Sequence, residues 1–228
     1  MGNPLRVVHY VNQFFGGIGG EDVAHVGVSL SDATVGSSRA LQQALGEQGT
    51  VVGTLVCGDN YANEQRHAML ATIQAHLQEI RPDVVIAGPA FGSGRYGLAC
   101  AQVCKAAQDI RVSAVTGMHP ENPGVVGSLS DIYIVPTGET SASMPAALAA
   151  MTQLALKLGR GVELGPAEHE GYMPRGIRRR HDRQRPGYQR ALDMLRAKLR
   201  GEPFTTEVPI HIPERVLPAA PLVDHTAA

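Results

Sequence analysis

Short apolar runs in this sequence are followed by polar residues of the types that do chemistry. Cys57 is followed by Asp59 and Asn60, and a later polar segment contains His119 and Glu121. A cysteine near a histidine and carboxylates can be an activated nucleophile, a metal ligand or an inert buried thiol. All three interpretations of Cys57 stay open, with the buried thiol favoured. Neither CxxC nor HExxH occurs in the sequence, and we predict no metal site.

The glycine-rich segment 11–22 is a second place where a ligand or a partner could bind. It reads VNQFFGGIGGED and begins where the apolar run 5–11 ends. Glycine lets another molecule approach the backbone closely, and free N–H groups bind anions. The glycines lack the G-x-G-x-x-G spacing and no P-loop lysine follows, so we predict no nucleotide or other cofactor. We favour a carboxylate-binding or partner-docking loop, and Glu21 with Asp22 is either an acid/base pair or, more commonly, a helix cap.

The elements that must position these residues follow from the apolar pattern. Apolar runs alternate with helical patterns, which is typical of an α/β fold with an open, mostly parallel, doubly wound sheet and helices on both faces. The predicted strands are residues 5–11, 50–57, 83–88, 112–116 and 131–135. The predicted helices are residues 37–47, 62–80, 95–108, 141–159 and 188–199. From residue 201 onward five prolines and no helical period predict an extended C-terminal arm.

Ligands of such sheets bind beyond the carboxyl ends of the strands, so the polar strand exits are expected to form one pocket. Asp, Asn and Gly are also ordinary turn formers, but here every exit carries polar or glycine residues. The residues assigned to catalysis are Cys57, Asp59, His119 and Glu121. The residues assigned to substrate binding are Asn12, Gln13, Gly17, Gly19, Gly20, Asn60, Arg95, Tyr96, Thr116 and Met118.

Length and composition indicate one substantial core followed by a C-terminal extension. The chain has 228 residues, of which 43% are hydrophobic. We predict an α/β domain at 1–160, an irregular connection with an arginine-rich helix at 161–200, and the proline-rich arm at 201–228. No apolar stretch is long enough for a membrane span, and the N-terminus lacks the layout of a secretory signal. Three cysteines, an odd number, argue against a disulfide framework, and we predict a cytoplasmic protein.

The formal net charge of −1 hides an asymmetry. Residues 175–200 hold ten of the twenty Lys and Arg residues and only two Asp residues. Aromatic residues are not interleaved with these charges, so we do not predict a nucleic-acid partner. The run 178–180 is a solvated face or meets an acidic partner. Cys100 and Cys104 lie one helical turn apart among apolar neighbours, which favours burial over metal binding.

Seven blocks of residues together resemble the glycine/sarcosine/betaine reductase component B family. They keep the family's order and approximate spacing from about residue 5 to residue 224, although no single block is specific. The blocks are the glycine-rich segment 11–22, CGDNY at 57–61, AGPAF at 87–91, GRYG at 94–97, TGM at 116–118, ENPG at 121–124 and EGY at 170–172.

The resemblance implies an activity and a missing partner. Component B is the substrate-specific part of a complex that reductively cleaves the C–N bond of glycine, sarcosine or betaine. Family members are longer, and a selenocysteine or cysteine in their C-terminal half attacks and carries the chemistry to other components. This chain resembles the N-terminal half alone, so a separately encoded chain would supply that residue. The chain departs from the family at 35–38 and at His119, where a tyrosine is usual, which leaves the substrate open.

The leading hypothesis is therefore a reductase subunit of a hetero-oligomer, inactive without its partner, that binds a small polar substrate for reductive cleavage of a C–N or C–S bond. The assigned roles are hydrogen bonding for Asn12, Gln13, Asp59 and Asn60, carboxylate pairing for Arg95, and proton donation for His119 and Glu121. Two alternatives remain: a non-catalytic assembly module of such a complex, and a self-sufficient thiol enzyme that uses Cys57.

Overall fold

The structure, a computed structural model, describes residues 3–176 and 186–204. It divides into two compact units, Met1–Arg178 and Arg179–Ala228, which we describe separately. The predicted proline-rich arm lies almost entirely outside the described residues, as does the arginine run 178–180.

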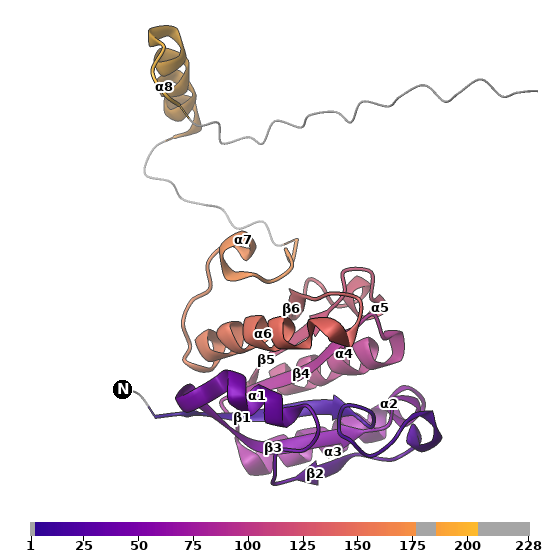
Figure 1. Ribbon diagram of the computed structural model, residues 1–228. Helices are drawn as coiled ribbons and strands as arrows, with labels where there is room; N and C mark the ends of the chain where they lie inside the picture. Colours follow the sequence, from indigo (N-terminus) through magenta and orange to yellow (C-terminus); the bar gives the residue numbers. More distant parts are fainter. Residues whose placement is uncertain (1–2, 177–185, 205–228) are drawn as a thin grey trace, which may run out of the picture. The chain divides into compact units, whose positions relative to one another are not determined.

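The first unit is built around one six-stranded sheet (Figure 1). Its strands are β1 (Leu5–Asn12), β2 (Ser29–Ser31), β3 (Gly49–Cys57), β4 (Val84–Phe91), β5 (Ser113–Met118) and β6 (Tyr133–Pro136). They lie in the order β2-β3-β1-β4-β5-β6, and all neighbours are parallel except β2 and β3. Every residue of β4 is buried, as expected for a central strand covered on both faces.

The predicted mostly parallel sheet is confirmed, and β2 is an addition to it. The sequence analysis missed β2 because it has three residues and no apolar run, and it pairs antiparallel only at the edge of the sheet. The five predicted strands are present, each within about three residues of its expected ends.

Helices cover both faces of the sheet, as predicted (Figure 1). The helices of this unit are α1 (Ser38–Leu45), α2 (Asp59–Glu64), α3 (Arg66–Ile80), α4 (Gly94–Asp109), α5 (Pro123–Val126), α6 (Met144–Gly159) and α7 (Ala167–Glu170). On one face α3 buries Met69, Ile73 and Leu77 in the same apolar cluster as residues of α4. On the other face α1 and α6 pack through residues such as Leu41 and Leu148.

The predicted helix 62–80 is two helices in the structure. The backbone at Gln65, with φ −112° and ψ 37°, ends α2 before α3 begins. The first of these helices, α2, begins at Asp59, with only Gly58 between it and the end of β3. The consequence for function is that Asp59 stands at the first turn of a helix instead of in a loop.

Residues 161–176, which belong to the predicted irregular connection, pack against the β6 edge of the sheet. The Met173 N–H donates to the Ile134 carbonyl at 2.7 Å. The rings of Tyr133 and Tyr172 meet edge to face, with centroids 5.1 Å apart. These contacts join the segment to β6, and α7 lies within it.

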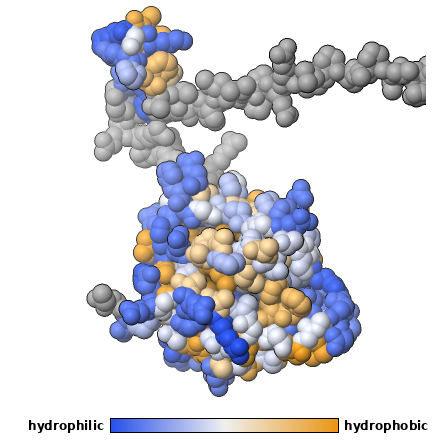
Figure 2. Space-filling view, in the orientation of Figure 1, coloured by the Kyte–Doolittle hydropathy of each residue, from blue (hydrophilic) through white to orange (hydrophobic). Residues whose placement is uncertain are grey.

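The second unit contains α8 (Gly187–Arg200), the predicted last helix. None of its residues is buried, and Leu192, Leu195 and Leu199 are exposed. Figure 2 shows strongly hydrophilic and strongly hydrophobic surface on this helix. No helix in the described parts of the chain is long and apolar enough to cross a bilayer.

His9 lies inside the sheet and gives the fold a measurable pH dependence. Its Nε2–H donates to the Gly88 carbonyl at 2.6 Å, so Nδ1 accepts from the Ser38 hydroxyl at 2.7 Å. Burial lowers the pKa of His9 from 6.5 to about 4, although the bond to Gly88 opposes this change. His9 therefore stays neutral in the folded protein at pH values where the unfolded chain protonates it.

We expect the free energy of unfolding to fall by up to about 3 kcal/mol as the pH is lowered through this window. The sign follows because the unfolded state binds the extra proton between pH 6.5 and about 4. Urea unfolding of wild type and His9→Gln, measured across that window, checks the expectation. Equal pH slopes in the two proteins would contradict it.

Candidate functional site

Asp59 and the carboxyl end of β1 form the centre of the candidate site. In the parallel register Asn12 lies beside Cys57, two residues before Asp59. Asn12 Nδ2 donates to Asp59 Oδ2 at 2.9 Å, and the Asp59 N–H donates to Gln13 Oε1 at 2.9 Å. Asn12 Oδ1 is itself fixed by the N–H of Phe15. The structure therefore brings together three residues that the sequence analysis assigned to the site.

The second carboxylate oxygen of Asp59 is the unusual feature of this centre. The residue is only 6% exposed, yet Oδ1 has no hydrogen-bond donor among the described residues. Buried polar atoms nearly always have such a partner. Burial raises the pKa of Asp59, while the hydrogen bond from Asn12 and the charge of Arg95 oppose the rise. Asp59 is thus a buried carboxyl group with a free acceptor and an increased affinity for a proton.

Arg95 and its partners form a second polar group near this centre. Arg95 lies in the first turn of α4 and donates to Asn60 Oδ1 and, at 2.5 Å, to Glu21 Oε1. Asn60 Nδ2 lies 3.3 Å from His25 Nε2. The charges of Arg95 and Glu21 both act on the pKa of Asp59, in opposite directions. The structure therefore brings Arg95 and Asn60 together, and the Arg95 guanidinium is already paired with Glu21.

The glycine-rich loop uses its own N–H groups internally. The donors from Gly16 to Gly20 all bond within the loop, to acceptors between Asn12 and Asp22. Gly17 has φ +75°, a backbone conformation that favours glycine. An anion cradle needs free N–H groups, and this loop offers none between Gly16 and Gly20. Of the two interpretations from the sequence, partner docking fits better, because Phe14 and Ile18 at the loop are 63% and 48% exposed.

Cys57 is buried at the end of β3. Burial, and to a smaller extent the charge of Asp59, raises the pKa of the Cys57 thiol to about 12, although a hydrogen bond with Tyr10 opposes the rise. His9 makes its hydrogen bonds to Ser38 and Gly88 and none to Cys57. The thiol is protonated throughout the neutral range, which favours the buried structural thiol among the three interpretations.

Alkylation tests this description of the thiols. We expect Cys57, Cys100 and Cys104 to resist iodoacetamide in the folded protein at mildly alkaline pH, because all three are buried and burial raises the pKa of each. In concentrated guanidinium chloride all three are expected to react. Mass spectrometry of the labelled peptides measures both states, and rapid labelling of folded Cys57 would contradict the assignment.

Three of the predicted binding residues lie behind the centre, inside the core. Tyr96, Thr116 and Met118 are fully buried. The Tyr96 hydroxyl and Thr116 Oγ1 have no hydrogen-bond partner among the described residues. Asp59 and Cys100 both act on the pKa of Tyr96, so these groups share one buried polar region. Met118 contributes apolar packing instead of a surface that a ligand reaches.

His119 and Glu121 lie in a separate arrangement after β5. The His119 N–H donates to the Phe91 carbonyl at 3.0 Å, and the Glu121 N–H donates to His119 Nδ1 at 3.3 Å. Glu121 is exposed. Across the described residues no hydrogen bond or ion pair connects either side chain with Asp59 or Arg95. Their assigned role as proton donors stays a prediction.

Two neighbours of the site were missed from the sequence. His25 contacts Asn60. Tyr10 lies near Cys57 and Asp59, and its hydrogen bond with Cys57 opposes the rise in the pKa of that thiol. Tyr10 was missed because it lies among the apolar residues of β1, where the sequence indicates only a core position. In the described ranges no group of three or more His, Cys, Asp or Glu residues is arranged to hold a metal ion.

Fold and site together define a class of protein. Taking the parallel strands alone, β3-β1-β4-β5-β6 is the 2-1-3-4-5 order of doubly wound folds whose ligands bind where the strand order reverses. That reversal lies between β1 and β4, and Asn12 and Arg95 stand on its two sides. The chain is thus a doubly wound α/β protein with a polar centre at its switch point.

Residues 4–228 match the sequence pattern of the glycine/sarcosine/betaine reductase selenoprotein B family, and the chain belongs to this family. The family expected from the seven blocks is confirmed. The chain is 45% identical over 225 residues to the glycine reductase complex component B subunit gamma of Carboxydothermus hydrogenoformans, covering 98% of this chain and 52% of that protein. It is 41% identical over 215 residues to the sarcosine reductase complex component B subunit beta of Peptoclostridium acidaminophilum, covering 94% and 49%.

A third relative widens the range of substrates named among these proteins. The betaine reductase complex component B subunit beta of Peptoclostridium acidaminophilum is 39% identical over 226 residues, covering 98% of this chain and 52% of that protein. The chain spans about half the length of these curated relatives. No solved structure matches the chain.

Proposed function

We propose that this chain is the substrate-binding subunit of a reductase complex of the glycine, sarcosine or betaine type. In this proposal it binds a small polar substrate at the switch point, and a separately encoded chain supplies a selenocysteine or cysteine for reductive cleavage of a C–N or C–S bond. The named relatives are subunits of such complexes, which supports the coarser part. A cytoplasmic location belongs to the same proposal.

The observation that carries the proposal is the free Oδ1 of the buried Asp59. An amine that leaves from a cleaved C–N bond needs a proton, and a carboxyl group with a raised pKa can hold one. Asn12 and Gln13 keep Asp59 in place through hydrogen bonds. Arg95 supplies the cation for a substrate carboxylate, provided that the carboxylate replaces Glu21 as its partner. Holding a substrate in this geometry lowers the barrier without a covalent step in this chain.

Reconstitution tests the proposal. The full chain is mixed with candidate chains that carry a Sec/Cys segment, and complexes are identified by size-exclusion chromatography with light scattering. Turnover is then measured with glycine, sarcosine and betaine and a dithiol reductant. We expect turnover of at least one substrate only in the complex. A complex that forms but turns over none of these substrates, nor a thioether analogue, would contradict the proposed activity.

A non-catalytic assembly module is the second candidate. The exposed Phe14 and Ile18 and the internally bonded loop favour it, because a rigid loop with apolar side chains suits a protein contact. Under this alternative Asp59→Ala and His119→Ala leave both the complex and its turnover intact. The third reading, a self-sufficient thiol enzyme, requires activity of the isolated chain that disappears in Cys57→Ala. The buried, protonated Cys57 does not favour it.

A further inference from the structure

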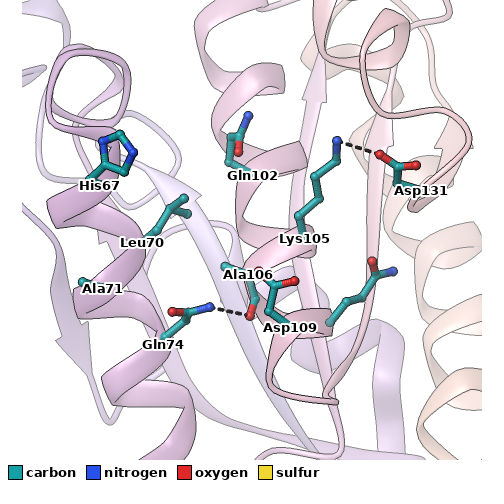
Figure 3. Close-up of a pocket in the computed structure, with 10 residues that line it drawn as sticks. His67, Leu70, Ala71, Gln74, Gln102, Lys105, Ala106, Asp109 and Asp131 are labelled. Carbon is teal, nitrogen blue, oxygen red and sulfur yellow. Dashed lines mark hydrogen bonds and ion pairs between the residues drawn. The ribbon is translucent and has the colours of Figure 1, made fainter.

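A groove lies between α3 and α4 on one face of the first unit (Figure 3). It has a volume of about 570 Å³, within the range of known ligand sites. Side chains of α3 line one wall and side chains of α4 the other, and Asp131 approaches from the segment before β6. Leu70, Ala71 and Ala106 give the groove apolar surface. None of the catalytic or binding assignments made above, Arg95 apart, concerns residues near this surface.

Carboxamide side chains are the distinctive polar groups of the groove. Gln74, Gln102 and Gln108 line it from both helices. Gln74 Nε2 donates to the Ala106 carbonyl at 3.1 Å, which leaves its own oxygen available (Figure 3). The side-chain amides of Gln102 and Gln108 make no hydrogen bond to other described residues. A carboxamide both donates and accepts, as a peptide group does, so these walls are complementary to a polypeptide backbone.

A smaller hollow of about 120 Å³ continues the groove toward the N-terminal ends of α3 and α4. Gln102 lines both spaces, and Arg66 and Arg95 line the smaller one. The Arg66 side chain is exposed and makes no ion pair or hydrogen bond within the described ranges, whereas the Arg95 side chain is paired with Glu21. The guanidinium of Arg66 is therefore the group beside the hollow that can bind a carboxylate.

The far end of the groove has the opposite charge. Lys105 is held at 2.8 Å by Asp131 and at 3.1 Å by the Gly127 carbonyl, so its charge is compensated. Asp109 is exposed, and no cation pairs with it in the described parts of the chain. The groove is thus basic at the Arg66 end and acidic at the Asp109 end. A ligand that fits both ends carries an anion and a cation separated by an uncharged stretch.

From these observations we propose that the groove between α3 and α4 binds an extended polypeptide segment of a partner subunit, with a carboxylate of that segment held by Arg66. The carboxamides accept the backbone, the apolar floor accepts a leucine-sized side chain, and Asp109 accepts a basic residue. A glycine-sized ligand would leave the larger space empty, which is why a polypeptide fits better. The proposal does not depend on any catalytic role of Asp59.

Short fluorescent peptides test the proposal with the full chain. The probe is a labelled Lys-Ala-Leu-Ala-Glu peptide with an amidated C-terminus, and fluorescence anisotropy measures its affinity. A version with Gln in place of Glu and a free C-terminus distinguishes a side-chain carboxylate from a terminal one. Glutarate, as competitor, shows how much of the affinity comes from the carboxylate alone. The complete chain is used because the groove has not been isolated as a folding unit.

We expect Arg66→Ala to weaken peptide binding by about 10-fold, because it removes a charge-assisted hydrogen bond. Gln102→Leu is expected to weaken it as well, since it removes a carboxamide that lines both spaces. Arg39→Ala is the matched control, because Arg39 is exposed on α1, on the other face of the sheet. Circular dichroism verifies that each variant is folded. Peptide binding is measured on the isolated chain without any turnover assay, so a failure of this proposal can be distinguished from a failure of the proposed reductase function.

Three outcomes would overturn the inference. The first is no binding of either peptide by folded wild type. The second is binding that Arg66→Ala and Gln102→Leu leave unchanged, which would place the peptide elsewhere. The third is glutarate binding as tightly as the peptides, which would show a small-anion site without any contribution from the groove.

Discussion

Asp59→Asn is expected to reduce turnover of the reconstituted complex by about 100-fold, the lower range for loss of a general acid. The substituted side chain has nearly the same shape, and its oxygen can still accept from Asn12. It cannot deliver a proton from a carboxyl group, nor can it carry a negative charge toward a cationic substrate. The measurement is steady-state turnover with saturating partner chain, together with light scattering to show that the complex still forms.

The pH dependence of stability distinguishes a functional effect of this substitution from a structural one. Because the pKa of Asp59 is raised on folding, the folded state binds the proton more tightly than the unfolded state. The stability of wild type relative to Asp59→Asn should therefore increase as the pH falls toward the range where the carboxyl protonates. At neutral pH the variant is expected to be at least as stable as wild type, because it removes a buried charge.

Asp32→Asn provides the matched control, since Asp32 is exposed and no ion pair connects it with the described chain. It is expected to keep the wild-type turnover. If Asp59→Asn retains full turnover in an intact complex, Asp59 has no catalytic role and the assembly module becomes the better description. If both substitutions reduce turnover equally, the effect is not specific to the buried carboxyl group.

The sheet could be predicted because its signal is local. Runs such as 5–11 and 83–88 are mostly apolar, and the intervening helical patterns leave few arrangements other than a parallel sheet. Met69, Ile73 and Leu77 recur at steps of four residues in the sequence, as one face of a helix does, and all three are buried. The edge strand β2 could not be predicted. It has only three residues, too few to show an alternating apolar pattern, and it pairs with a strand distant in the sequence.

The site could be predicted only in part. The sequence shows which polar residues follow a strand end, but it does not show where their side chains point or which groups they contact. Asn12, Gln13 and Asp59 do meet, as the converging strand exits required. The pairing of Arg95 with Glu21 joins residues that are 74 positions apart, and no pattern encodes it. Tyr96 and Thr116 belong to the predicted blocks, yet their side chains are buried in the core. Alternation along a strand fixes a face of the sheet, whereas the depth of a side chain depends on the helices that cover it.

Gly58→Ala is expected to destabilise the first unit by about 3 kcal/mol, a cost typical of overpacking against atoms that cannot move aside. A Cβ at this position would lie 2.1 Å from the Ala24 carbonyl oxygen and 2.9 Å from the Val26 nitrogen. Both are backbone atoms, so no side chain can rotate away. With φ −70° and ψ 139°, the backbone at Gly58 is ordinary, and the cost therefore comes from the collision and not from its conformation.

The same collision should also open the candidate site. The Ala24 carbonyl accepts from the N–H groups of Asn60 and Tyr61, and the Gly58 N–H donates to the Val26 carbonyl at 2.9 Å. Moving residues 24–26 away breaks these bonds at the start of α2, where Asp59 is held. Urea unfolding measures the loss of stability, and alkylation of Cys57 in the folded variant measures the opening. Gly127→Ala is the control, because no atom lies within 4 Å of its added Cβ. Equal stability of the two variants would show that residues 24–26 shift at little cost. These residues would then not hold the start of α2, and with it Asp59, rigidly in place.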